Sequence, residues 1–243
     1  MATPASVEWP EAPASPPPGV FVTGTGTEVG KTVVAATIAR MAHAAGRKVR
    51  VFKAALTGLD DYAQRPLESP EWASADQLPD HILLRLAAGS EQPVDEIAPH
   101  RFGPAVSPHL AGELAGEPID PEKLVAAARA AAERADLFVC EGVGGFLVPL
   151  SSDYLVRDLA RELAMPVVIA AAPGLGTINH TLLTLESVRG AGLEVLSVVL
   201  TPWPQVPGEV ERGNLEAISR LGEVTVQTLP RLDLTQPVSW PQL

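Results

Sequence analysis

The segment Gly24-Thr-Gly-Thr-Glu-Val-Gly-Lys-Thr32 follows the apolar run Val20-Phe-Val-Thr23 and leads directly into an Ala-rich stretch with helical spacing. Glycines let backbone N–H groups turn toward an anion, and the N-terminus of a helix adds positive potential there. In such a loop Lys31 reaches the outer phosphates of a nucleotide, and the hydroxyl of Thr32 is suited to bind Mg²⁺. A strand, a glycine-rich loop and a helix in this order predict a phosphate-binding loop.

The loop departs from the strict pattern at one position, because Thr25 stands where glycine is usual and the glycine comes one residue earlier, at Gly24. Gly26 and Gly30 remain, so the departure changes little for phosphate binding and indicates a variant subclass. Thr27 and Glu28 lie at positions where such loops carry varied residues. Each of them could face a second substrate.

Short β-branched runs alternate with Ala- and Leu-rich stretches along the rest of the chain. This alternation is typical of a parallel sheet that helices cover on both faces. We therefore expect one α/β domain with a mostly parallel β-sheet flanked by helices on both faces, of phosphate-loop NTPase type. The predicted strands are 20–23, 49–54, 137–141, 166–171, 193–200 and 224–228, the predicted helices are 32–45, 121–135, 177–191 and 210–221, and long loops are expected at 58–79 and 89–118.

Composition sets the limits of the domain. With 46% hydrophobic and 19% charged residues in a chain of 243, a substantial core can form. Residues 1–18 differ, because they hold six prolines, no basic residue and no apolar run. They cannot be a secretory signal, and we expect an unpacked tail at 1–18 followed by the domain at 19–243.

The charge and the single cysteine exclude several classes of function. A formal charge of −11 disfavours general attraction to nucleic acid or to an anionic membrane, so neither is expected as a partner. Cys140 is the only cysteine, which rules out an internal disulfide and a zinc site built from several thiolates. No stretch resembles a spanning helix, and the apolar surroundings of Cys140 favour a packing role. The cytoplasm is the expected location.

Charged residues at the ends of predicted strands are the next candidates, since ligands of open α/β sheets bind beyond the carboxyl ends of the strands. Lys53 ends one strand in an apolar stretch, where a lone ammonium is costly unless an anion meets it. Glu141 ends another strand and precedes Gly142-Val-Gly-Gly145, so it is a natural partner for Mg²⁺. Spacing alone does not choose among the acids of the first long loop, Asp60, Asp61, Asp76 and Asp80.

The histidines give a weaker signal. The five histidines show no metal-ligand spacing, and His43 in a helix is expected to be structural. His109, in the second long loop, could be structural or functional.

Five segments together resemble the dethiobiotin synthetase family, in matching order and spacing from about Val20 to Pro230. They are the phosphate loop, Phe52-Lys-Ala-Ala-Leu-Thr-Gly58, Ser107-Pro-His109, Glu141-Gly-Val-Gly-Gly145 and Gly174-Leu-Gly-Thr-Ile-Asn-His180. The resemblance implies an ATP-dependent ligase that converts CO₂ and 7,8-diaminopelargonic acid into dethiobiotin through a phosphorylated carbamate. It also implies Mg²⁺ with no further cofactor, and a homodimer with the active site near the subunit interface.

The resemblance also assigns roles to individual residues. Lys31, Lys53, Thr27 and Glu28 would lie at the reacting centre, and Thr32, Glu141 and an aspartate would hold Mg²⁺. For that aspartate we choose Asp80, which resembles the family's aspartate at the start of a short helix, and we keep Asp76 in reserve. The expected nucleotide-binding residues are Gly26, Thr27, Glu28, Val29, Gly30, Lys31, Thr32, Glu141 and Gly144. Thr57 is expected to bind the substrate near its amines. The substrate carboxylate is expected to be bound by four residues of the other subunit, Gly176, Thr177, Ile178 and Asn179.

Three departures from the family pattern are visible. Thr201 stands where many members have an asparagine that reads adenine, so the base preference stays open. Ala54 follows Lys53 where proline is usual, and Val143 replaces a common alanine.

Two other functional classes share features with this sequence. A nucleotide-switch ATPase of the partitioning or septum-placement type carries an extra lysine in its loop, at the place that Gly26 occupies here. A glutamine-dependent amidating synthetase carries a glutaminase domain, for which this chain has neither the length nor a suitable cysteine context. Both classes are therefore less favoured than the ligase.

Overall fold

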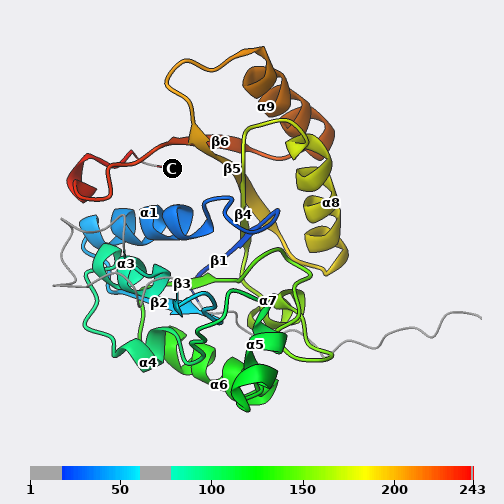
Figure 1. Ribbon diagram of the computed structural model, residues 1–243. Helices are drawn as coiled ribbons and strands as arrows, with labels where there is room; N and C mark the ends of the chain where they lie inside the picture. The colour runs from blue at the N-terminus through cyan, green and yellow to red at the C-terminus, as the bar shows by residue number, and fades with distance from the viewer. Residues whose placement is uncertain (1–17, 61–77, 242) are drawn as a thin grey trace, which may run out of the picture.

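The computed structural model describes residues 18–60, 78–241 and 243, which form a parallel β-sheet of six strands with helices on both faces (Figure 1). The strand order is β2-β3-β1-β4-β5-β6, and every neighbouring pair is parallel. The strands are β1 (Gly19–Gly24), β2 (Val49–Lys53), β3 (Leu137–Glu141), β4 (Val167–Ala171), β5 (Val195–Trp203) and β6 (Val226–Pro230).

Two hydrophobic clusters lie on opposite faces of this sheet. Alternate residues of β1 enter different clusters: Phe21 packs against helices α6 and α7, while Val20 and Val22 pack against α1 and α3. The helices are α1 (Lys31–Ala44), α3 (Asp80–Ala87), α4 (Val94–Ile97), α5 (Pro108–Ala115), α6 (Pro121–Ala132), α7 (Val156–Leu163), α8 (Thr177–Gly190) and α9 (Glu209–Gly222), followed by the 3-10 helix η2 (Pro237–Ser239). None of these helices is both long and apolar enough to cross a bilayer.

The predicted α/β domain with a parallel sheet is confirmed, and each of the ten predicted strands and helices occurs with its ends within three residues of the expected ones. The prediction of a long loop at 89–118 is wrong in part, because α4 and α5 lie within it. Both helices are short and begin next to a proline, Pro93 before α4 and Pro108 at the start of α5. Proline is compatible with the first turn of a helix, so its presence concealed these two helices.

Helix α7 has no counterpart among the predicted elements. Its buried residues are Val156, Leu159, Ala160 and Leu163, at the i, i+3, i+4, i+7 spacing of an amphipathic helix. Residues 61–77 of the other predicted loop, 58–79, and residues 1–17 of the predicted tail at 1–18 lie outside the described residues.

The position of β3 between β1 and β2 brings the candidate residues together. Strand β1 pairs with β3 in a register that sets Val22 opposite Glu141, and β2 pairs with β3 so that Lys53 is opposite Glu141. Parallel strands end at the same edge of a sheet. The glycine-rich loop, Lys53 and Glu141 therefore meet at one edge.

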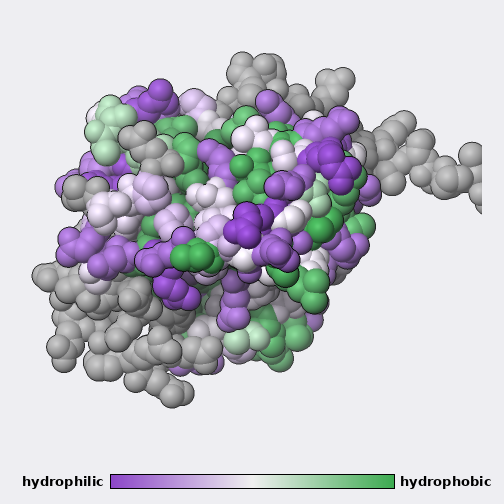
Figure 2. All heavy atoms as spheres, turned by 90° about the horizontal axis from the view of Figure 1, so that it is seen from above, coloured by the Kyte–Doolittle hydropathy of each residue, from purple (hydrophilic) through white to green (hydrophobic). Residues whose placement is uncertain are grey.

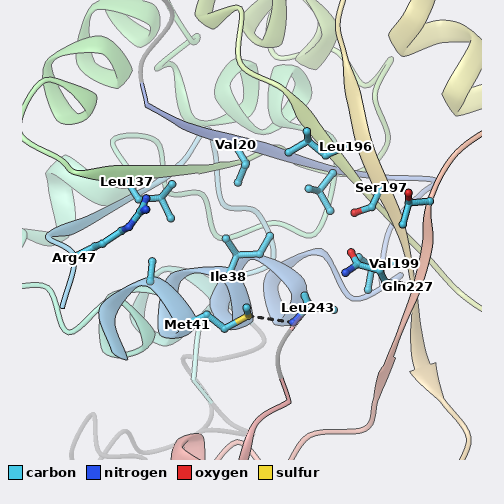
Figure 3. A pocket seen from close by; sticks show the side chains of 13 residues that line it. Val20, Ile38, Met41, Arg47, Leu137, Leu196, Ser197, Val199, Gln227 and Leu243 are labelled. Carbon is cyan, nitrogen blue, oxygen red and sulfur yellow. Dashed lines mark hydrogen bonds between the residues drawn. The ribbon is translucent and has the colours of Figure 1, made fainter. Parts of the chain in front are cut away.

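An apolar groove of about 490 Å³ lies beside the C-terminal half of α1 (Figure 3), and no residue of the glycine-rich loop lines it. Ile38 and Met41 line it from α1, and Val168 and Val199 line it from the sheet. The backbone N–H of Leu243 donates to Met41 Sδ at 3.2 Å. The C-terminal segment thus covers part of the sheet face that α1 leaves open.

The face viewed in Figure 2, from the side on which α9 lies in Figure 1, carries hydrophobic and hydrophilic residues intermixed. Large hydrophobic side chains are exposed at several separate positions of the described surface, among them Leu175 and Val206.

Cys140 is fully buried in β3, and burial raises the pKa of its thiol well above its usual value. Only the thiolate reacts readily with disulfide reagents. We therefore expect the folded protein to resist a thiol-disulfide reagent and to react with one equivalent after denaturation in guanidinium. Fast labelling of the folded protein, monitored by absorbance, would contradict this packing role.

Candidate functional site

The phosphate loop connects β1 to α1 and has the backbone geometry of an anion-binding turn. Gly30 has φ +86°, and a Cβ atom added there would lie 2.5 Å from Thr201 Cγ2. Glycine is therefore required at position 30 both for its backbone conformation and for the close approach of Thr201. No side chain caps the N-terminus of α1, so its first N–H groups are open to an anion.

Lys31 is buried at the base of this loop. Its Nζ donates to the carbonyl of Gly26 at 2.6 Å. The pKa of Lys31 is lowered to about 8, mainly by burial and also by the charge of Lys53, while the charges of Glu141 and Asp80 oppose this shift. The ammonium group lies where it can exchange the Gly26 carbonyl for a phosphate oxygen.

A cluster of opposite charges lies beside the loop, and we call Lys53, Asp80 and Glu141 the buried ion cluster. Lys53 Nζ is 2.5 Å from Glu141 Oε1 and 2.8 Å from Asp80 Oδ2. Thr32 Oγ1 donates to the same Glu141 Oε1 at 2.9 Å, which ties the cluster to the first turn of α1. Glu141 is fully buried and Lys53 is 3% exposed, so neither charge is stable there without the other.

The pKa values in the cluster reflect this mutual dependence. Burial raises the pKa of Glu141, and the charge of Lys53 opposes that rise. Burial lowers the pKa of Lys53, but the charges of Asp80 and Glu141 outweigh it, so the net pKa is raised and the ammonium stays protonated. Burial also acts to raise the pKa of Asp80, yet Lys53 and a hydrogen bond from Thr32 lower it overall.

The side chains of this edge fit a magnesium ion. Glu141 Oε2 is buried without a hydrogen-bond partner, which leaves one carboxylate oxygen free for a cation. Thr32, Glu141 and Asp80 supply the hard oxygen ligands that Mg²⁺ prefers alongside phosphate oxygens. Within the described part of the chain no three His, Cys, Asp or Glu side chains gather, so a metal here would need the hydroxyl and the nucleotide as well.

One cavity of about 390 Å³ contains the loop and the ion cluster. It brings together most of the residues that the sequence singled out: Thr27, Glu28, Gly30, Lys31, Thr32, Lys53, Thr57, Asp80, Glu141 and Gly144. Gly26 and Val29 belong to the same loop but do not line the cavity. Asp80 forms an ion pair with Lys53 in this cavity, whereas Asp76 lies outside the described residues.

The cavity also has lining residues that the sequence did not indicate. Leu234 comes from the C-terminal segment, and Leu78 and Leu83 come from the region around α3. They are apolar residues without any motif, and only the folded chain brings them to the loop. Thr201, which stands where many family members have an asparagine, is 3% exposed and packs on Gly30.

The four predicted substrate residues at 176–179 are not part of this cavity. They lie at the N-terminus of α8, where Gly176 has φ +91° and no side chain caps the helix. Leu175, just before them, is 97% exposed.

The two histidines considered from the sequence also lie outside the cavity lining. His109 Nδ1 is 3.0 Å from Ser107 Oγ at the start of α5. His43 lies against Gly89, where an added Cβ would be 2.3 Å from its ring, so its contacts are structural.

The ion cluster yields a stability prediction. Lys53→Met leaves Glu141 buried without its counter-charge, which costs about 3–5 kcal/mol of unfolding free energy. Adding Glu141→Gln removes the unpaired buried charge, so the double variant should regain part of the lost free energy of unfolding, measured by urea denaturation. Arg129→Met, at the partly exposed Arg129–Glu162 pair, serves as a control with an expected cost below about 1 kcal/mol. A double variant less stable than Lys53→Met would contradict the analysis.

Solved structures share this architecture. The chain aligns with the signal recognition particle receptor FtsY of Elizabethkingia anophelis at TM-score 0.52 and 17% identity, covering 97% of this chain and 66% of that one. It aligns with the septum site-determining protein MinD of Pyrococcus horikoshii, solved with Mg-ADP, at TM-score 0.51 and 15% identity, covering 90% and 86%. At these identities the likeness shows the fold alone, and it does not favour the nucleotide-switch alternative.

Sequence relatives identify the family. Residues 18–240 match a family model described as an AAA domain. The ATP-dependent dethiobiotin synthetase BioD of Anaeromyxobacter dehalogenans (strain 2CP-C) is 40% identical over 182 residues, 75% of each chain. The enzymes of the same name from Rhodococcus erythropolis, 39% identical over 216 residues, and Bacillus subtilis subsp. natto, 34% identical over 208, cover 88% and 86% of this chain and 86% and 84% of their own lengths. The chain belongs to the family of ATP-dependent dethiobiotin synthetases.

Proposed function

We propose that this enzyme carboxylates 7,8-diaminopelargonic acid with CO₂ and closes the ureido ring of dethiobiotin at the expense of ATP. The observation that carries the proposal is that one cavity contains both the phosphate loop with Lys31 and a second buried lysine, Lys53. A loop that only holds phosphates does not need Lys53. A reaction that joins two anions, a nucleotide and a carbamate, needs positive charge on both sides.

The reaction divides into three steps that balance. One substrate amine adds to CO₂ and loses a proton, which gives a carbamate. A carbamate oxygen then attacks the γ-phosphorus of ATP, the bond from that phosphorus to the bridging oxygen breaks, and ADP leaves. Finally the second amine attacks the carbamate carbon, the C–O bond to phosphate breaks, and phosphate and a proton leave.

The chain's own residues position these groups. Lys31 contacts the transferred phosphoryl group and the carbamate, and Lys53 neutralises charge from the opposite side. Thr27 and Glu28 line the reacting centre, and Thr57 lies near the substrate amines, in agreement with the place of all three in the cavity wall. Holding the reactants in line and neutralising their charge is the main contribution of a protein to phosphoryl transfer.

Thr32, Glu141 and Asp80 would hold Mg²⁺, and the unpartnered Glu141 Oε2 supports this assignment. The bound ion would screen the negative charge of the β- and γ-phosphates. No cofactor beyond Mg²⁺ is part of the proposal.

We infer a homodimer in which the segment 176–179 of one subunit binds the substrate carboxylate in the site of the other. Two observations support it: the segment does not line the cavity of its own chain, and Leu175 is almost fully exposed beside it. In the proposed dimer the partner subunit would cover this leucine. The proposed location is the cytoplasm.

The activity is tested by omission. The purified protein should consume ATP only when the diamine, bicarbonate and Mg²⁺ are all present, and mass spectrometry should detect dethiobiotin. Robust ATP hydrolysis without the diamine, with no ureido product, would refute the ligase proposal.

The shared site is tested by mixing two variants. Lys53→Ala removes a charge at the reacting centre, and Asn179→Asp sets a carboxylate against that of the substrate, so each variant alone should turn over little at low diamine. After co-refolding in equal amounts, half of the dimers are mixed and each has one intact site, so about a quarter of the wild-type activity should return. Activity no higher than the mean of the two separate variants would show that each subunit builds its own site.

A further inference from the structure

Asn214, in α9, makes a paired contact that the proposed reaction has not yet used. The residue is 7% exposed, and its Nδ2 donates to the carbonyl of Pro173 at 2.9 Å and to that of Gly174 at 3.0 Å. These carbonyls belong to the loop between β4 and α8, about forty residues earlier in the chain. One buried amide thus binds two consecutive carbonyls of a loop on a neighbouring element.

The contact fixes the direction of two peptide N–H groups. The bonds Pro173–Gly174 and Gly174–Leu175 are trans, and in a trans peptide the C=O and N–H groups point in opposite directions. With both carbonyls turned toward buried Asn214, the N–H groups of Gly174 and Leu175 point away from it. Neither has a hydrogen-bond acceptor among the residues that the structure describes.

These two N–H groups lie next to the uncapped N-terminus of α8. No side chain caps this helix. The N–H of Thr177, its first residue, donates to the carbonyl of Gly174 at 3.3 Å, whereas the N–H groups of Ile178 and Asn179 have no acceptor among the residues that the structure describes. The loop and the helix therefore present free donors together, which is the arrangement that binds a carboxylate.

Within the described residues the Pro173 carbonyl has no donor other than Asn214, and the Gly174 carbonyl has only the N–H of Thr177 besides Asn214. Gly174 and Gly176 flank its tip, and an added Cβ at Gly174 would meet no atom within 4 Å. Glycine gives a chain access to backbone conformations that other residues avoid. Peptides next to glycine can rotate, and a rotated peptide would present a carbonyl oxygen where an N–H is needed.

We propose that Asn214 is a positioning residue for substrate recognition: by holding the carbonyls of Pro173 and Gly174, it keeps the loop's N–H groups directed at the carboxylate of the diamine. The inference rests on the proposed function, in which this segment binds that carboxylate. Asn214 itself does not touch the substrate.

The test uses two variants of Asn214 and a control on the same helix. Asn214→Asp keeps the size but sets a carboxylate against two carbonyl oxygens, and Asn214→Ser is too short to reach both. Ser219→Ala is the control, because it removes another α9 side chain that donates to a backbone carbonyl, that of Val224 at 3.3 Å, far from the loop.

With the full-length enzyme, Asn214→Asp should raise KM for the diamine roughly tenfold, which corresponds to the loss of one or two hydrogen bonds, while KM for ATP changes less than about twofold. Asn214→Ser should have a smaller effect in the same direction, and Ser219→Ala should have none. A parallel rise in both KM values would show a general structural defect and overturn the inference.

A substrate analogue separates positioning from folding. In the analogue a methyl group replaces the carboxylate of the diamine. The wild-type enzyme should bind this analogue more weakly than the acid, and Asn214→Asp should bind it no worse than the wild type does. If Asn214→Asp weakened binding of the acid and of the analogue equally, or did not weaken binding of the acid, the role of Asn214 would be refuted while the carboxylate site would stand. Equal KM values of the wild-type enzyme for the two compounds would refute the carboxylate site itself, and the role of Asn214 with it.

Discussion

The burial of Lys53 between two carboxylates is the interaction on which the rest of the site depends. Glu141 is fully buried at the end of a central strand, and a carboxylate there is tolerated only beside a positive charge. The register of β2 on β3 sets Lys53 directly opposite Glu141, so the sheet itself forms the pair. Asp80, at the start of α3, contacts Lys53 Nζ, and Thr32, in the first turn of α1, donates to Glu141 Oε1, so both helices are attached to the pair. A change in any of these four residues disturbs the others.

The phosphate loop is also attached to the buried pair of Lys53 and Glu141. Thr32 connects the loop's helix to Glu141, and Lys31 lies close enough to Lys53 for the two charges to oppose each other. Thr201, from the end of β5, packs on Gly30 and limits that position to glycine. Two lysines held close together in a buried cavity bind anions more strongly than either alone, because the repulsion between them is relieved when a phosphate arrives. This arrangement suits a reaction between two anionic partners.

Much of the fold and part of the site were predictable from the sequence, for reasons that differ between residues. Lys53 and Glu141 could be singled out because charged residues at the ends of apolar strands have few structural explanations. The helix α7 carried a regular apolar spacing and could have been predicted, whereas the prolines near α4 and α5 concealed those helices. Leu234 and Asn214 could not have been found, because their importance comes from contacts with segments far away in the chain. Spacing alone does not distinguish Asp80 from the other aspartates of its loop, and only the family resemblance favours it.

The central claim is that the phosphate of ATP is transferred to a carbamate rather than to water, and oxygen transfer tests it most directly. The enzyme is supplied with freshly mixed bicarbonate labelled with oxygen-18, the diamine, ATP and Mg²⁺, and the released phosphate is analysed by mass spectrometry before the label exchanges with water. If a carbamate oxygen attacks the γ-phosphorus and the later ring closure breaks the C–O bond, each phosphate carries one labelled oxygen. Unlabelled phosphate released together with ADP would mean that water is the acceptor, and it would contradict the account.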